Sequence, residues 1–197
     1  MEKVETKFVE LMELLDSEWN IVKYENDIAT ERKFLPGCDI ACFKSTGYVK
    51  ADPGDLMEYV ASIYDSTENM KKHDLEIINY EVVHDLTDDT RLCYQINSLG
   101  WPLWPRDLVY LQTIRKEDDA YWIYMYSVES GDKPEQKDKY VRANLNISAY
   151  GFIPKDDGSV VHRIAHVDPG GSIPVGIINN YANKTANMIK ELKIKFA

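Results

Sequence analysis

The stretch that decides the fold is VRANLNISAYGFIPKDDGSVVHRIAHV, residues 141–167. Its first half alternates: Val141, Ala143, Leu145, Ile147 and Ala149 share one face of an extended chain, and the residues between them are polar. The tetrapeptide KDDG at 155–158 is typical of a tight turn, and the segment after it is again rich in β-branched residues. The pattern predicts two antiparallel strands with one apolar face.

The segments before this hairpin extend the same sheet. Residues 75–86, 90–99, 106–116 and 120–130 are rich in β-branched and aromatic side chains, and acidic loops separate several of them. Short alternating stretches between residues 19 and 51, broken at Pro36-Gly37, predict further strands. Because consecutive strands are joined by short loops, we expect a long antiparallel meander.

Helical periodicity occurs at both ends of the chain and once between. Residues 1–19 carry apolar side chains three and four apart, and residues 51–55 form a turn that leads into a second short helix. From the N-cap candidate Ser172 to Phe196 the pattern predicts one helix of about 24 residues, roughly 36 Å long. We therefore expect a single α+β domain over residues 1–197, with a curved sheet closed by this last helix.

Composition limits the class of protein. The chain has 197 residues, 44% of them hydrophobic, and a formal net charge of −10. This charge disfavours nucleic acid as a partner, because nucleic-acid binding depends on neutralising phosphates. The N-terminal stretch is acidic and amphipathic, unlike a secretory signal, and Cys38, Cys42 and Cys93 lack the spacing of a metal site. These features predict a cytoplasmic protein without a metal or other cofactor.

The loop GWPLWP, residues 100–105, places two tryptophans and a leucine between prolines, directly before the dipeptide Arg106-Asp107. Tryptophan is usually buried, whereas proline-rich connections run over the surface. Trp101, Leu103 and Trp104 either contact a membrane, where the amphipathic indole is favoured, or fill the end of the core with one ring.

The chain resembles the START (StAR-related lipid transfer) domain family in residues 106–116, residues 140–154 and the segment HVDPGGSIPVGIINNY, 166–181. The likeness covers essentially the whole chain. Ceramide-transfer and phosphatidylcholine-transfer members are nearest in pattern. The resemblance implies the helix-grip fold, START and Bet v 1-like, with an internal hydrophobic tunnel for one lipid. It also implies a gating loop at 100–105 that touches the membrane, and it makes Arg106 and Asp107 structural residues that bond each other and the loop backbone.

The resemblance also assigns the tunnel wall and its polar end. Asp74 and Gln95 fall on head-group residues of the ceramide-transfer pattern, whereas Met125 replaces an asparagine there and Gln112 replaces a buried arginine of cholesterol-binding members. Arg163 is a candidate for binding a phosphate, for pairing with Asp74, or for an ordinary salt bridge at the sheet edge. The full set of expected lipid-binding residues is Asp74, Gln95, Tyr110, Gln112, Met125, Val141, Ala143, Leu145, Arg163, Ile178 and Tyr181.

The expected function is therefore lipid binding and transfer between membranes by a monomer, without catalysis, and with only transient membrane contact. The lipid class, whether sterol, ceramide or phospholipid, is left open. Two alternatives remain: a helix-grip enzyme of the cyclase or hydratase type acting on a hydrophobic molecule, and a ligand-gated sensor. No nucleophile-elbow or phosphate-loop motif supports the enzyme.

Overall fold

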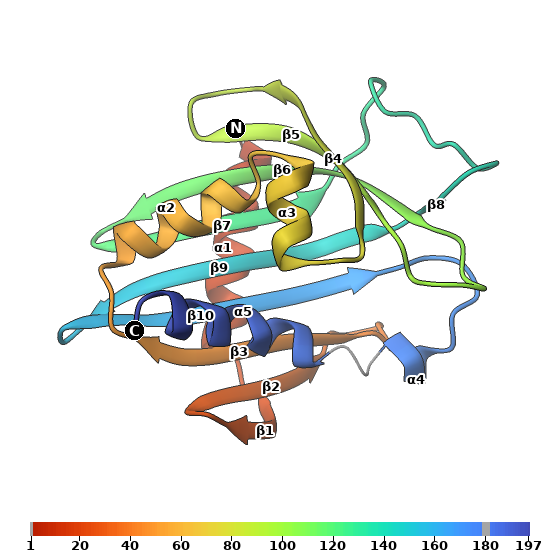
Figure 1. Cartoon of the computed structure of the whole chain (residues 1–197). Helices are drawn as coiled ribbons and strands as arrows, with labels where there is room; N and C mark the ends of the chain where they lie inside the picture. The colour runs from red at the N-terminus through yellow and green to blue at the C-terminus, as the bar shows by residue number, and fades with distance from the viewer. Residues whose placement is uncertain (1, 179–181) are drawn as a thin grey trace.

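The computed structural model describes residues 2–178 and 182–197. Within these ranges, ten strands form one curved sheet in the order β1-β2-β3-β10-β9-β7-β6-β5-β4, and the short β8 pairs parallel to β6 (Figure 1). The strands are β1 (Asn20–Glu25), β2 (Ile28–Phe34), β3 (Ala41–Val49), β4 (Ile77–Asp85), β5 (Thr90–Asn97), β6 (Arg106–Glu117), β7 (Ala120–Ser127), β8 (Val141–Arg142), β9 (Asn144–Lys155) and β10 (Gly158–Asp168).

The expected antiparallel meander is confirmed for β4 through β10, except for the parallel β8. The first three strands do not continue it beside β4. They join the opposite side of the sheet, where β3 pairs with β10 from Val49 opposite Ser159 to Phe43 opposite Ala165. This arrangement makes β9 and β10 central strands of the sheet, and most of their residues are buried or half-buried.

Helices cover the two faces of the sheet differently. In Figure 1, α1 (Glu2–Asp16) passes behind the sheet, whereas α2 (Pro53–Ile63), α3 (Thr67–His73) and α5 (Ala182–Lys195) lie in front of it. One apolar cluster, centred on Phe8, Leu11 and Trp122, fills the space beneath α1. A larger cluster lies between the other face of the sheet and α2, α3 and α5. The functional interior is therefore on the face that α5 covers.

Polar side chains cap the N-termini of the two early helices, α2 and α3. The Asp52 carboxylate accepts a hydrogen bond from the Gly54 backbone nitrogen at 2.7 Å, and Pro53 occupies the first turn of α2. The Ser66 hydroxyl accepts from the Asn69 nitrogen at 3.1 Å and starts α3. Both caps satisfy backbone donors that the first helical turn leaves unpaired.

The predicted C-terminal helix is described as two helical segments, α4 (Val175–Ile178) and α5, while residues 179–181 lie outside the described residues. α5 packs closely on β3 at Gly47. A Cβ atom at Gly47 would lie 2.8 Å from a methyl carbon of Ile189. The absence of a side chain at this position lets the helix lie against the sheet.

A β-bulge in β9 changes which residues face the interior. Val167 pairs with Leu145 and His166 pairs with Ile147, so Asn146 is the extra residue. Before the bulge the odd-numbered Leu145 faces the interior, and after it the even-numbered residues do. The prediction that Ile147 and Ala149 share one face with Leu145 is therefore wrong, because both pack in the cluster beneath α1.

Candidate functional site

A cavity of about 570 Å³ lies between the sheet, α3 and α5. This volume is within the range of small-molecule sites, about 300–1,000 Å³. Apolar side chains from several strands make up most of its wall, and a few polar groups interrupt it. The apolar wall residues include Phe43, Ile63, Met70, Ile77, Leu108, Met125, Ala143, Leu145 and Val167.

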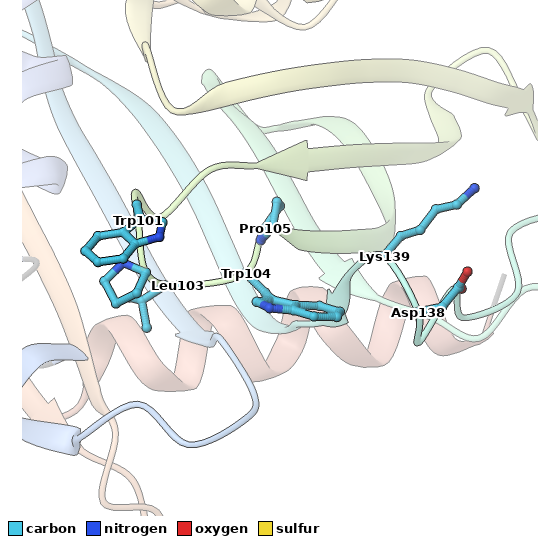
Figure 2. A pocket seen from close by; sticks show the side chains of 7 residues that line it. Trp101, Leu103, Trp104, Pro105, Asp138 and Lys139 are labelled. Atoms are coloured by element: carbon cyan, nitrogen blue, oxygen red, sulfur yellow. The ribbon is translucent and has the colours of Figure 1, made fainter.

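The mouth of the cavity lies beside the loop of residues 100–105. Leu103 lines the cavity, whereas Trp101 is 96% exposed and Trp104 is 54% exposed. Trp104 faces a shallow surface hollow that Asp138 and Lys139 border (Figure 2). Neither indole fills the core, so the interpretation in which one tryptophan closes its end is wrong.

Leu75 is a mouth residue that the sequence did not single out. It lies between α3 and β4, lines the cavity, and is 93% exposed. The backbone nitrogen of Ser98, just before the loop, donates to the carbonyl oxygen of Glu76 at 2.7 Å. Leu75 thus lies on a segment bonded to the base of the same loop. The signal that could have identified it is an apolar residue placed directly after the charged segment KKHD.

Arg106 anchors the loop to the segment that precedes α4. Its Nη1 donates to the Trp104 carbonyl oxygen, its Nε to Pro169 at 3.0 Å, and its Nη2 to Gly170 at 3.2 Å. Gly170 has a φ of 63°, a left-handed conformation that favours glycine. The expected bond from Arg106 to the loop backbone is therefore present.

Asp107 has different partners from Arg106, because adjacent strand residues point to opposite faces. Its carboxylate accepts from Arg142 Nε at 3.0 Å and Nη2 at 2.8 Å, and from the Tyr94 hydroxyl at 3.2 Å. Asp107 is 1% exposed, so this is a bidentate ion pair in the protein interior. The recorded bonds give Asp107 a structural role through Arg142 and Tyr94, not through Arg106.

Two of the expected head-group residues are already bonded within the protein. The Gln95 side chain accepts from the Tyr110 hydroxyl at 2.9 Å and donates to Asn97 at 2.8 Å. Asp74 lies 3.7 Å from Lys184 Nζ, which also pairs with Glu76. Asp74 therefore pairs with Lys184 of α5 at the mouth, and not with Arg163.

Arg163 also lines the cavity, but it lies against an aromatic ring. Its guanidinium carbon is 4.3 Å from the centre of the Tyr150 ring, on the neighbouring strand β9. Nη1 donates to the backbone oxygens of Ile164 and, at 3.4 Å, of Ala149. Arg163 is thus neither a partner of Asp74 nor part of a salt bridge at the sheet edge.

A second polar cluster that the sequence did not reveal joins α2, α3 and α5. His73 Nδ1 contacts the Glu191 carboxylate, and the Tyr59 hydroxyl donates to the same carboxylate at 3.2 Å. His73 and Glu191 both line the cavity. These contacts tie the helices together at one wall, and no local sequence pattern relates residues so far apart.

Not every expected residue reaches the cavity. Most of the expected set line it: Asp74, Gln95, Tyr110, Met125, Ala143, Leu145, Arg163 and Ile178. Gln112 is buried beyond it, where Arg91 Nε donates to its side-chain oxygen at 3.4 Å. Val141 instead lies beside Gly170 and Gly171. Tyr181 is outside the described residues.

Metal binding and the protonation of buried groups can be read from the described part of the chain. Within it, no group of three or more His, Cys, Asp or Glu side chains is placed to hold a metal ion. His162 lies across the sheet from the cavity, and burial lowers its pKa to about 4. The buried hydroxyls of Tyr64 and Tyr110 also have raised pKa values because of desolvation, so they remain neutral hydrogen-bond donors.

None of the described helices combines the length and the apolar composition needed to cross a bilayer.

The sequence of this chain is similar to a known family model and to known proteins. The START domain family model matches residues 1–196. Ceramide transfer protein of Cricetulus griseus is 25% identical over 189 residues, covering 86% of this chain and 31% of that protein. The human ceramide transfer protein is 24% identical and 30% covered. The chain therefore spans less than a third of the length of these relatives.

Solved structures share the architecture. Human StAR-related lipid transfer protein 5 superposes with a TM-score of 0.82 at 16% identity, covering 99% of this chain and 95% of that one. A STAR-related lipid transfer protein from Xanthomonas axonopodis gives a TM-score of 0.74 at 24% identity, with coverages of 91% and 99%. The helix-grip fold is thus confirmed, and with a family match from residue 1 to residue 196 this chain belongs to the START domain family.

Proposed function

We propose that this protein binds one lipid in its internal cavity and carries it between membranes, without changing it chemically. The position of the cavity relative to the loop of residues 100–105 supports this proposal. An apolar-walled cavity of about 570 Å³ opens beside a loop whose apolar side chains are turned to the outside. The ceramide transfer relatives support this function, since they share the family with this chain.

The cavity supplies the driving force for holding a lipid. Each CH₂ group removed from water contributes about 0.8 kcal/mol, and strands β6, β7 and β9 line the cavity with apolar side chains such as Leu108, Met125 and Leu145. The polar groups at the mouth, Asp74 and Lys184, are paired with each other and so do not oppose the passage of an acyl chain.

The loop supplies the membrane contact. Trp101 and Trp104 project from the mouth, and an indole ring is favoured at the bilayer interface because its apolar body and its N–H group lie in different environments. Leu75 places a third exposed apolar side chain next to this loop. A net charge of −10 opposes general adhesion to anionic membranes, so we assign the attraction to these apolar side chains.

We further propose that the protein acts as a cytoplasmic monomer that touches membranes transiently and requires no cofactor. Its three cysteines are free thiols in the described structure, which suits a reducing compartment. Nucleic acid is not expected as a partner.

A vesicle assay tests the proposal. Donor vesicles containing a fluorescent lipid and a quencher are mixed with acceptor vesicles, and the protein is expected to accelerate the appearance of fluorescence. Mass spectrometry of the recovered lipid then separates the alternatives. An unchanged lipid mass supports the carrier, whereas a lipid of altered mass would support the cyclase or hydratase type of enzyme. No acceleration with sterol, ceramide or phospholipid would contradict transfer.

A further inference from the structure

Arg163 is a cation on the wall of an apolar cavity. Among the residues of β10 that line the cavity, Arg163 lies farthest along the strand from Pro169, which follows β10 and also lines the cavity. The side chain is mostly removed from bulk water, where an unpaired charge is costly. Its environment therefore has to contain, or receive, a compensating group.

The carboxylates that line the cavity already pair with other side chains of the protein. Asp74 and Glu76 pair with Lys184, and Glu191 pairs with His73 and Tyr59. Among the residues that the structure describes, no Asp or Glu oxygen lies within 4 Å of the Arg163 guanidinium. The protein thus offers this cation no anionic partner of its own.

The hydrogen-bonding capacity of Arg163 is also incompletely used. A guanidinium has five N–H donors. The recorded acceptors, the backbone oxygens of Ala149 and Ile164, engage Nη1 only. The contact through the face of the Tyr150 ring holds the group in place but uses none of its donors. Nε and Nη2 therefore remain available to a ligand.

Neighbouring side chains add further donors at the same depth. The Tyr64 and Tyr150 hydroxyls lie 2.9 Å apart, and because one donates to the other, one of their two protons is left over. Ser148 lines the cavity two residues from Tyr150 on β9 and pairs across the sheet with Ala165. A positive charge surrounded by hydroxyl donors matches an acceptor-rich anion better than a neutral alcohol or amide.

We infer that the lipid carried in this cavity has an anionic head, a phosphate or a carboxylate, which Arg163 binds with the hydroxyls of Ser148 and the Tyr64–Tyr150 pair. The inference rests on the proposed function and narrows its lipid class to acidic lipids. It also fixes the orientation of the lipid, with the head inside and the acyl chains directed toward the mouth at Leu103.

The experiment compares lipids that differ only in head charge. Dioleoyl phosphatidate is matched with dioleoylglycerol, and oleate with oleyl alcohol, and the bound fraction of each is measured by native mass spectrometry after incubation with vesicles. The wild-type protein is expected to retain the anionic member of at least one pair about 10- to 100-fold better, as for a charge-assisted hydrogen bond. The pair that shows the preference identifies phosphate or carboxylate.

Variants of Arg163 test whether this residue causes the preference for anionic lipids. Arg163→Met should abolish the preference, so that the two members of each pair are retained equally, while Arg163→Lys should keep part of the preference. Arg32→Met is the matched control, because Arg32 also lies over an aromatic ring, that of Phe34 at 5.3 Å, but outside the cavity. It should behave like the wild type. Thermal unfolding of each variant verifies folding, and Arg163→Gln replaces Arg163→Met if the latter unfolds.

The outcomes are distinct from those of the proposed function. Wild-type protein that binds and transfers neutral lipids equally well overturns the anionic head and leaves the carrier intact. Retention of the preference in Arg163→Met also overturns the inference. Binding of inorganic phosphate at Arg163 without any preference between the paired lipids would assign the site to a free anion and overturn the lipid head. No binding of any lipid contradicts the carrier itself.

Discussion

Arg106 Nη2 lies 3.2 Å from the carbonyl oxygen of Gly170, and this contact joins the start of β6 to the turn that leads into α4. The same guanidinium also holds the carbonyl oxygen of Trp104. Two segments that border the cavity mouth, far apart in the sequence, therefore share one buried cation. Their positions are expected to be coupled.

Replacing Arg106 should loosen both segments. Arg106→Lys keeps the charge but loses the fork that reaches three carbonyl oxygens, so we expect the free energy of unfolding to fall by about 2 kcal/mol. Limited proteolysis should show faster cleavage near residues 100–105. A variant with unchanged stability and cleavage would show that the three bonds do not hold the loop. Arg32→Lys, near the protein surface, serves as the control.

The exposed tryptophans should act on membranes and not on folding. Replacing Trp101 and Trp104 together with alanine is expected to lower vesicle binding and lipid transfer at least about tenfold, because both rings contribute to interfacial partitioning. Thermal stability should change little, since both side chains are already exposed. The matched control is the pair Ile21 and Tyr24 on β1, each 69% exposed and remote from the mouth. Unchanged transfer after loss of the tryptophans would contradict the membrane role of the loop.

Leu75 should contribute to the same contact. Leu75→Asp places a carboxylate where we expect the bilayer to lie, so vesicle binding measured by co-sedimentation should decrease by roughly tenfold. Leu86→Asp is a suitable comparison, because Leu86 is 54% exposed in the loop after β4 and does not line the cavity. Equal losses in both variants would indicate a general effect of added negative charge.

The Asp107–Arg142 pair should be a major contribution to stability. Asp107→Asn leaves Arg142 without its anionic partner, and breaking a buried pair typically costs about 3–5 kcal/mol. Chemical denaturation measures this loss. A double-mutant cycle with Arg142→Met separates the coupling from the effect of each single change. A coupling energy near zero would show that the bidentate geometry contributes nothing.

Stability should decrease in acid because of His162. Burial lowers the pKa of its imidazole from 6.5 to about 4, so below pH 6.5 the unfolded chain binds a proton that the folded protein does not. The stabilisation is therefore complete above about pH 6.5 and is lost as the pH falls toward 4. Between pH 7 and pH 5 we expect a loss of about 2 kcal/mol from this residue.

Urea denaturation at pH 7 and pH 5 measures this effect. The loss should shrink in His162→Gln and persist in His84→Gln, because the His84 side chain is 55% exposed. His166 acts in the same direction, since burial also lowers its pKa, so part of the acid sensitivity should remain in His162→Gln. An identical pH dependence in the wild type and His162→Gln would contradict the assignment.

Much of the fold follows from local patterns in the sequence. The strand before the turn at 155–158, the strand after it, and the turn at 51–55 that leads into α2 each depend on neighbouring residues, and each is present in the structure. The strand register could not be predicted in the same way. The bulge at Asn146 reverses the faces of β9, and a bulge depends on the pairing with β10 and not on the alternating residues themselves.

Some features of the candidate site likewise follow from the sequence, and others follow only from the tertiary structure. The sequence alone determined that an apolar-faced antiparallel sheet is combined with a C-terminal helix, and that two tryptophans lie in a proline-rich loop, because periodicity and proline act over a few residues. Only the tertiary structure decided that Asp74 pairs with Lys184 and that Arg163 faces the cavity without a carboxylate. Ion pairing depends on distances between strands and helices that are remote in the chain, and these distances exist only after the sheet has curved and α5 has packed against it.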